Sequence, residues 1–166
     1  MPVRLDASGS PVTSVTVLGV RGIGEVVAGA DVASLVVDAL AHDGVPLGAG
    51  DCLVISSKVA SKALGLTWSG SKEDAVAAGT VRVVAERWAE GRPTRVVESA
   101  AGPVMAAAGV DASNTGPSAA LLVLPDDPDA VAARLRSDVL ALLGLPEATP
   151  FAVVLSDTAG RAWRGG

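Results

Sequence analysis

The feature that most constrains the fold is a helical repeat of apolar residues between Asp31 and Gly44. The repeat has the three- and four-residue spacing of one helix face: Val32, Leu35, Val36, Ala39 and Leu40. Asp31 is a good N-cap, and Gly44 follows where glycine commonly ends helices. The only histidine, His42, falls in the last turn, so we interpret it as a helix-end cation rather than a catalytic group. The pattern predicts an amphipathic helix packed on a core.

Short apolar runs elsewhere predict strands. Residues 12–18 alternate apolar and polar side chains, whereas residues 52–56 and 151–155 are continuous apolar runs. The other segments of strand character are 95–98, 102–107 and 119–124. The chain is therefore expected to combine strands with helices.

Two further segments have helical character. Residues 71–90 carry apolar residues among charges and predict a helix with a weak point at Gly79 and Thr80. A last helix ends at Gly144 and begins in an acidic stretch, which contains Asp126, Asp127 and Asp129. Those carboxylates resemble a metal cluster, but helix initiation explains them better. Trp68 and Trp88 are interpreted as packing residues.

The composition narrows the possible functions. Of 166 residues, 49% are hydrophobic and 19% charged, so disorder is not expected. A net charge of -5 argues against general nucleic-acid binding, which needs a basic face. With one histidine and one cysteine, a disulfide framework, a zinc site of the Cys/His type and Ser-His-Asp catalysis are close to excluded. Cys52 is expected in the core.

The chain is expected to form one unit over residues 1–166. We expect it to be located in the cytoplasm, with no signal peptide and no membrane contact.

A cluster of oxygen-bearing side chains ends the apolar stretch at residues 107–114. Asp111 and Asn114 place a carboxylate and an amide in a tight turn, where they can face a cation or a phosphate. The same residue types are also ordinary in turns and helix caps, so both interpretations stay open here.

Asp157 follows another apolar strand in the same way. If one sheet edge brings Asp111 and Asp157 together, two carboxylates with neighbouring hydroxyl and amide oxygens suit Mg²⁺ or Mn²⁺. Arg161 and Arg164 could then neutralise charge on a transferring phosphoryl group.

Two other segments are candidate phosphate contacts. Residues 19–25 form a glycine-rich loop after a predicted strand, but their spacing matches neither the dinucleotide fingerprint nor the Walker A pattern, so a plain loop is an equal alternative. Residues 57–62 follow the strand 52–56, where Lys62 could contact a phosphate and Ser57 donate a hydroxyl. A solvated turn with surface lysines explains this segment equally well.

Taken together and in order, these motifs resemble the coenzyme F420-0:L-glutamate ligase (γ-glutamyl ligase) family. The resemblance runs from about Val15 to Arg164 and rests on Ser57-Lys58-Val59-Ala60-Ser61-Lys62, Val110-Asp111-Ala112-Ser113-Asn114, Pro125-Asp126-Asp127-Pro128-Asp129-Ala130 and Ser156-Asp157-Thr158 followed by Gly-Arg-Ala-Trp-Arg. It implies an α+β fold with a mixed β-sheet and packed helices, in which two subunits interlock as a homodimer.

The resemblance also implies a chemistry. A GTP- and metal-dependent ligase would activate the terminal carboxylate of coenzyme F420-0 as an acyl phosphate, which the amino group of L-glutamate then attacks. Asp111 and Asp157 would be the catalytic residues and, with Thr158, would bind Mg²⁺ or Mn²⁺. The GTP contacts would come from Ile23, Gly24, Glu25, Val26, Ser57, Lys62 and Asn114.

The sequence departs from the family pattern at three places. Leu64 and Leu66 stand where the family carries a charge pair, and residues 99–101 supply no cation before the Asp111 loop. The sequence also stops at Gly166, where relatives continue into a segment with further contacts, so we expect either a fragment or a shortened relative. The alternative function is a non-catalytic or regulatory nucleotide-binding relative.

Overall fold

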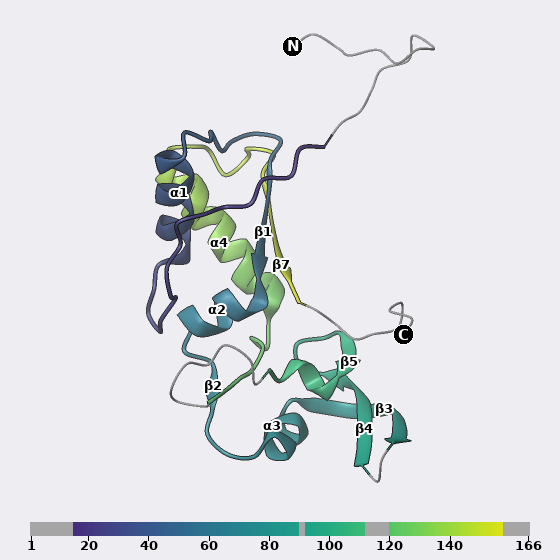
Figure 1. Ribbon diagram of the computed structural model, residues 1–166. Helices are drawn as coiled ribbons and strands as arrows, with labels where there is room; N and C mark the ends of the chain where they lie inside the picture. The colour runs from purple at the N-terminus through teal and green to yellow at the C-terminus, as the bar shows by residue number, and fades with distance from the viewer. Residues whose placement is uncertain (1–14, 90–91, 112–119, 158–166) are drawn as a thin grey trace, which may run out of the picture.

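The structure is a computed structural model that describes residues 15–89, 92–111 and 120–157. Helices and strands both occur, and strands pair in parallel and antiparallel fashion, which confirms the α+β class (Figure 1). The elements are α1 (Val32–His42), β1 (Cys52–Ser56), α2 (Ser57–Ala63), β2 (Thr67–Trp68), α3 (Lys72–Ala78), β3 (Thr80–Ala89), β4 (Arg92–Ser99), β5 (Val104–Ala106), the 3₁₀ turn η1 (Ala107–Gly109), β6 (Leu121–Leu122), α4 (Pro128–Leu142) and β7 (Ala152–Ser156). No helix in these ranges is long and apolar enough to cross a membrane.

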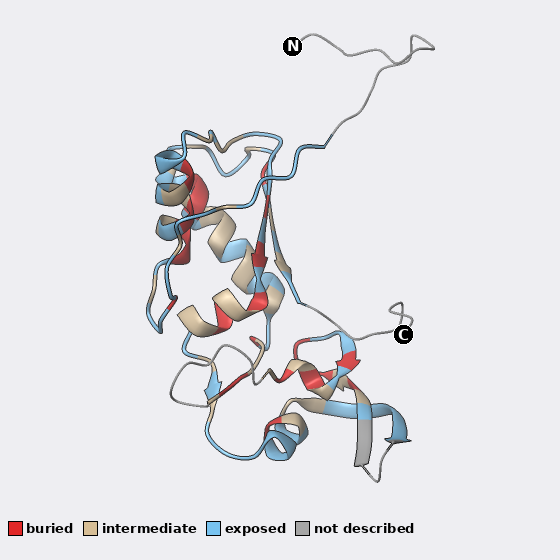
Figure 2. Cartoon of the chain, viewed as in Figure 1, coloured by how far each residue is buried: buried red, intermediate tan, exposed pale blue. Residues whose placement is uncertain are grey.

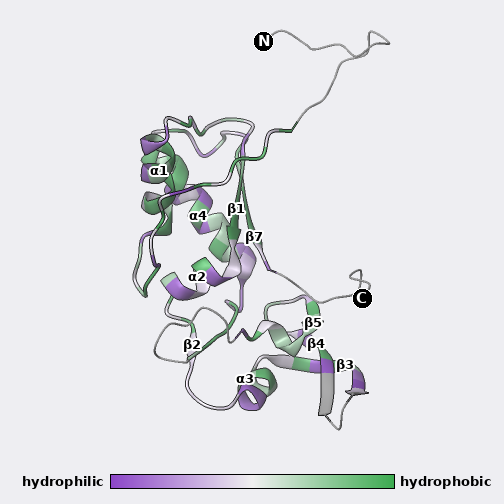
Figure 3. Ribbon diagram, viewed as in Figure 1, coloured by the Kyte–Doolittle hydropathy of each residue, from purple (hydrophilic) through white to green (hydrophobic). Residues whose placement is uncertain are grey.

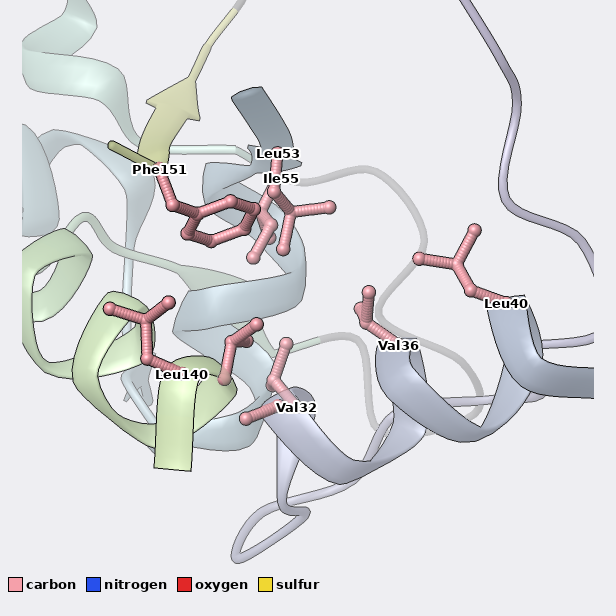
Figure 4. Close-up of a cluster of buried hydrophobic side chains, with 9 residues drawn as sticks. Val32, Val36, Leu40, Leu53, Ile55, Leu140 and Phe151 are labelled. Atoms are coloured by element: carbon pink, nitrogen blue, oxygen red, sulfur yellow. The ribbon is translucent and has the colours of Figure 1, made fainter. Parts of the chain in front are cut away.

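The main core lies between helices α1 and α4 and the parallel pair β1–β7. Figure 1 shows both helices on one side of this pair, and Figure 4 shows side chains from α1, α4, β1 and Phe151 converging on one cluster. Its buried members are Val32, Ala33, Val36, Leu40, Leu53, Ile55, Val139, Leu140 and Phe151. Burying each large aliphatic side chain contributes about 1.5–3 kcal/mol, so this cluster holds the four elements together.

The ends of the two long helices agree with the sequence predictions. The Asp31 carboxylate caps α1 by accepting a hydrogen bond from the main-chain N–H of Ser34, 3.0 Å away. His42 lies in the last turn of α1, as predicted. Asp127 caps α4 by accepting from the N–H of Ala130 at 2.8 Å, which confirms that the acidic stretch starts a helix.

A second group of elements lies below α2 in Figure 1. Strands β3, β4 and β5 form an antiparallel sheet, and α3 and η1 lie beside it. A short antiparallel pair, β2–β6, connects this group to α2. Figure 2 shows buried residues in both groups, around β1 with α1 and α4 and again around β5 and η1.

The helix predicted over residues 71–90 is wrong beyond its first half. Helix α3 ends at Ala78 with Gly79 as its C-cap, and the chain continues as strand β3, which pairs with β4. The run Thr80-Val81-Arg82-Val83-Val84 is rich in β-branched residues, which fit a pleated sheet better than a helix. Residues 90 and 91 lie outside the described part.

Two predicted packing residues are exposed instead. Cys52 was expected in the core, but β1 alternates so that Leu53 and Ile55 point inward and Cys52 points outward. Trp88, on β3, is 67% exposed, and its indole Nε1 donates to Glu86. Trp68 agrees better with the prediction, because it is half-buried and packs against a small cluster of Ala75, Val110 and Leu121.

Three predicted strands differ in extent. The strand predicted over 102–107 is limited to β5, Val104–Ala106, because the turn η1 begins at Ala107. Residues 15–18, part of the strand predicted over 12–18, have no strand partner in the described chain, and Val15 and Val17 are exposed; residues 12–14 lie outside it. Without a partner, an extended segment leaves its main-chain groups to water. The strand predicted over 119–124 is only two residues long, Leu121–Leu122, and residue 119 lies outside the described ranges.

Candidate functional site

Helix α2 is the element around which the candidate residues gather. It follows β1 without a loop, so its first residue continues directly from the end of a core strand. Ser57 and Ser61 are buried at 5% and 1% exposure, whereas Lys58 and Lys62 are only partly covered. Figure 3 shows the hydrophilic residues of α2 on either side of an apolar stretch. The seven residues therefore anchor one face of the helix and present lysines on another.

Lys58 forms an ion pair with Asp111. The distance from Lys58 Nζ to Asp111 Oδ2 is 2.5 Å, and the two side chains are 35% and 30% exposed. The main chain of Asp111 is fixed by two hydrogen bonds with Leu122: its N–H donates at 3.0 Å, and its carbonyl accepts at 2.8 Å. The carboxylate is thus held at a defined place beside the first turn of α2.

The turn that leads into Asp111 has an unusual backbone. Ala107, Ala108 and Gly109 all have positive φ angles, of 53°, 50° and 74°. For alanine this left-handed conformation costs about 1–2 kcal/mol, because Cβ approaches the carbonyl oxygen that follows it. Strain of this kind is often found where a side chain must be positioned for function. Asp111 therefore has two features of a site residue: a carboxylate that can bind a cation, and a strained turn immediately before it.

The glycine-rich segment contacts the other end of α2. Glu25 Oε1 lies 2.5 Å from Lys62 Nζ, and the N–H of Gly29 donates to the carbonyl of Ala63 at 2.8 Å. Ile23 packs against the main core, and Val26 is 7% exposed, so any ligand contact from Val26 would come from its main chain. The structure therefore brings Glu25 to Lys62, and both are candidate GTP contacts.

Asp157 lies near the start of α2 through the pairing of the two core strands. Ser156, the last residue of β7, pairs with Ser56, which immediately precedes α2. Asp157 follows Ser156 and is exposed. The register thus places Asp157 at the strand end from which α2 begins, and Asp111 contacts the first turn of that helix. Four further predicted residues lie outside the described part of the chain: Asn114, Thr158, Arg161 and Arg164.

The donor chemistry of the site fits a hard divalent cation. Asp111 and Asp157 offer carboxylate oxygens, the ligands that Mg²⁺ and Mn²⁺ prefer. Within residues 15–89, 92–111 and 120–157, no group of three or more His, Cys, Asp or Glu side chains is arranged to hold a metal. Asp111 belongs with the β2–β6 pair and Asp157 follows the β1–β7 pair, so one sheet edge does not carry both; their common neighbour is the start of α2. A complete coordination sphere would need further oxygens, from Thr158, a nucleotide or water.

Sequence reasoning did not single out Lys58 or Ser61. Ser61 donates its hydroxyl hydrogen bond to the carbonyl of Val123 at 2.8 Å, which ties α2 to the segment after β6. Lys58 and Lys62 are four residues apart, the spacing of neighbours on one helix face. Reading residues 57–62 as a helix, rather than as the turn after a strand, would have placed both lysines side by side.

The fold and the site together define an α+β protein in which lysines of one short helix meet carboxylates from two distant segments. The family model described as F420-0:Gamma-glutamyl ligase matches residues 21–166, and the chain belongs to that family.

Curated relatives agree with this assignment. The chain is 33% identical over 168 residues to the coenzyme F420:L-glutamate ligase of Halobacterium salinarum, a match that covers 89% of this chain and 61% of that protein. It is 32% identical over 170 residues to the enzyme of the same name from Methanothermobacter thermautotrophicus, covering 92% of this chain and 65% of the relative. The chain therefore spans about three fifths of the length of these relatives.

Proposed function

We propose that this chain acts in the ligation of L-glutamate to coenzyme F420-0, with GTP and a divalent metal as co-substrate and cofactor. The observation that carries the proposal is the meeting of three candidate segments at α2: Glu25 at Lys62, Asp111 at Lys58, and Asp157 at the strand end before Ser57. The printed names of the relatives support glutamate ligation. A homodimer and a cytoplasmic location remain predictions.

The proposed reaction has two steps. A carboxylate oxygen of F420-0 attacks the γ-phosphorus of GTP and GDP leaves, which gives an acyl phosphate. The amino nitrogen of L-glutamate then attacks the acyl carbon, phosphate leaves with the electron pair of the C–O bond, and an amide forms after the amine loses a proton. Such phosphoryl transfer depends on positioning and charge neutralisation more than on a protein nucleophile.

The protein's own residues would supply that positioning. Lys62 and the Ser57 hydroxyl would hold phosphate oxygens beside α2, together with Asn114 and main-chain groups of residues 23–26. Asp111, Asp157 and Thr158 would hold Mg²⁺ or Mn²⁺. When bound, that ion would neutralise charge on the transferring phosphoryl group.

The test is a direct assay of the purified protein. It is incubated with GTP, Mn²⁺, L-glutamate and F420-0, and GDP release and product mass are followed. Asp157→Asn should abolish metal-dependent product formation, whereas Asp138→Asn, an exposed carboxylate on α4, should not change it. GTP binding without turnover would favour the non-catalytic alternative, and the absence of both would refute the nucleotide hypothesis.

A further inference from the structure

The lysine-bearing face of α2 is neutralised by carboxylates of the very segments expected to bind metal and nucleotide. Lys58 Nζ lies 2.5 Å from Asp111 Oδ2, and Lys62 Nζ lies 2.5 Å from Glu25 Oε1. The two lysines share a face because they are four residues apart on a helix. Two cations that could contact phosphate groups are therefore each paired with a carboxylate.

Of the partners in the first pair, the lysine is the one that can move. Asp111 is fixed at its main chain by two hydrogen bonds with Leu122 and is preceded by a turn of positive φ angles. Lys58 carries its charge on a flexible four-carbon stem. A divalent cation that binds to Asp111 Oδ2 therefore has to displace the Lys58 ammonium group, because two cations repel each other at one oxygen.

We infer that Lys58 is a resident counter-cation of Asp111, which a divalent metal displaces and which then contacts the phosphate groups of the metal-bound nucleotide. The inference rests on the proposed function for the identity of both ligands. It assigns Lys58 two opposite effects: competition with the metal when no nucleotide is present, and support of nucleotide binding when the metal is present. A residue with only a structural role would not separate these effects.

The first test measures Mn²⁺ binding without nucleotide, by calorimetry or by the electron paramagnetic resonance of free Mn²⁺. Lys58→Met removes the competing charge and should bind Mn²⁺ more tightly, by up to about fivefold, the range expected for a partly exposed ion pair. Lys58→Arg keeps the charge and should stay near the wild type. Lys72→Met, a matched change at the first residue of α3, should also leave Mn²⁺ affinity unchanged.

The second test measures GTP affinity at saturating Mn²⁺. Here Lys58→Met should bind GTP several-fold more weakly than the wild type, the opposite direction to its effect on the metal. Lys58→Gln serves as a second neutral variant, and circular dichroism checks that each variant is folded. Unchanged or weaker Mn²⁺ binding in both neutral variants would overturn the inference while leaving the proposed function intact. A wild-type protein that binds no Mn²⁺ would instead refute the metal requirement itself, and the inference with it.

Discussion

The hydroxyl of Ser61 donates a hydrogen bond to the main-chain carbonyl of Val123, 2.8 Å away, between residues that are 62 positions apart. Ser61 is 1% exposed, and the N–H of Val123 in turn donates to the carbonyl of Leu66 at 3.1 Å. This pair of contacts joins helix α2 to the segment that continues from β6, whose Leu122 holds Asp111. The position of the candidate site thus depends on a buried polar contact as well as on apolar packing.

Replacing Ser61 by alanine should therefore destabilise the protein by about 1–3 kcal/mol, because the partly buried carbonyl of Val123 loses its donor. Denaturation with urea at neutral pH measures the free energy of unfolding. Ser69→Ala, at an exposed position outside the helices and strands, is the matched control and should change stability by less than about 0.5 kcal/mol. Equal effects of the two changes would contradict the role assigned to Ser61.

Arg136 on α4 gives a second prediction, because its guanidinium group binds the loop before β7. Its Nε donates to the carbonyl of Phe151 at 2.8 Å, and one terminal nitrogen donates to the carbonyls of Glu147 and Thr149 at 2.6 and 2.8 Å. The other terminal nitrogen lies 2.6 Å from the Glu147 carboxylate. A lysine ammonium group cannot reproduce this planar fork of donors.

Arg136→Lys should accordingly cost about 1.5–3 kcal/mol of unfolding free energy, the value of hydrogen bonds from a charged donor. Arg134→Lys, two residues away and 84% exposed, should stay within about 0.5 kcal/mol of the wild type. Thermal unfolding followed by circular dichroism compares the two variants. A loss of similar size in Arg134→Lys would show that the loop contacts of Arg136 do not matter.

The elements that sequence reasoning predicted are those with local signals. The caps at Asp31 and Asp127 and the apolar spacing within each helix depend on residues close in sequence, so α1 and α4 were predicted correctly. Strand β3 was missed because its stability comes from pairing with β4. This pairing cannot be read from the segment itself, whose apolar residues also fit the spacing of a helix.

The candidate site shows the same contrast between residue types, which the sequence gives directly, and tertiary contacts, which it does not. The chemistry of Asp111, Asp157 and Lys62 is readable from residue type, whereas their ion-pair partners are not, because Glu25 is 37 positions from Lys62. Cys52 shows that an apolar run predicts a strand but not which of its side chains are buried. Successive side chains of β1 point to opposite faces, and only Leu53 and Ile55 face the core.

A third prediction concerns the pH dependence of the α1 cap. The hydrogen bonds from the Ser34 main-chain N–H and hydroxyl lower the pKa of Asp31 below its ordinary value of 3.8. A lowered pKa in the folded state means that the ionised cap stabilises the protein above the unfolded-state pKa, and that this stabilisation is lost as the pH falls through the folded-state pKa. Asp31→Ala should cost about 0.5–2 kcal/mol at pH 7.

The control for this prediction is Asp31→Asn, which can still accept the capping hydrogen bond but carries no charge. Urea denaturation at several pH values compares the wild type with this variant. The wild type should be the more stable at pH 7, and its advantage should shrink as the pH falls below 3.8, where Asp31 becomes protonated in the unfolded chain and then in the folded one. A constant difference between the two proteins across this range would contradict the assigned pKa shift.

The last prediction concerns Gly109, two residues before Asp111. Its φ of +74° favours glycine, and an added Cβ would overlap the Leu124 side chain and lie 2.9 Å from Met105 Sδ. Gly109→Ala should therefore cost about 1–3 kcal/mol for the overlap, in addition to about 1–2 kcal/mol for the backbone conformation. Because the turn positions Asp111, the same change should also weaken Mn²⁺ binding.

Gly102→Ala separates the two contributions, since Gly102 also has a positive φ, of +101°, but no atom lies within 4 Å of an added Cβ. It should cost only the backbone contribution, about 1–2 kcal/mol, and leave Mn²⁺ affinity unchanged. Urea denaturation and Mn²⁺ titration of both variants measure the two effects. If Gly109→Ala bound Mn²⁺ as tightly as Gly102→Ala despite its lower stability, the strained turn would serve the packing of Met105 and Leu124 rather than the placement of the Asp111 carboxylate.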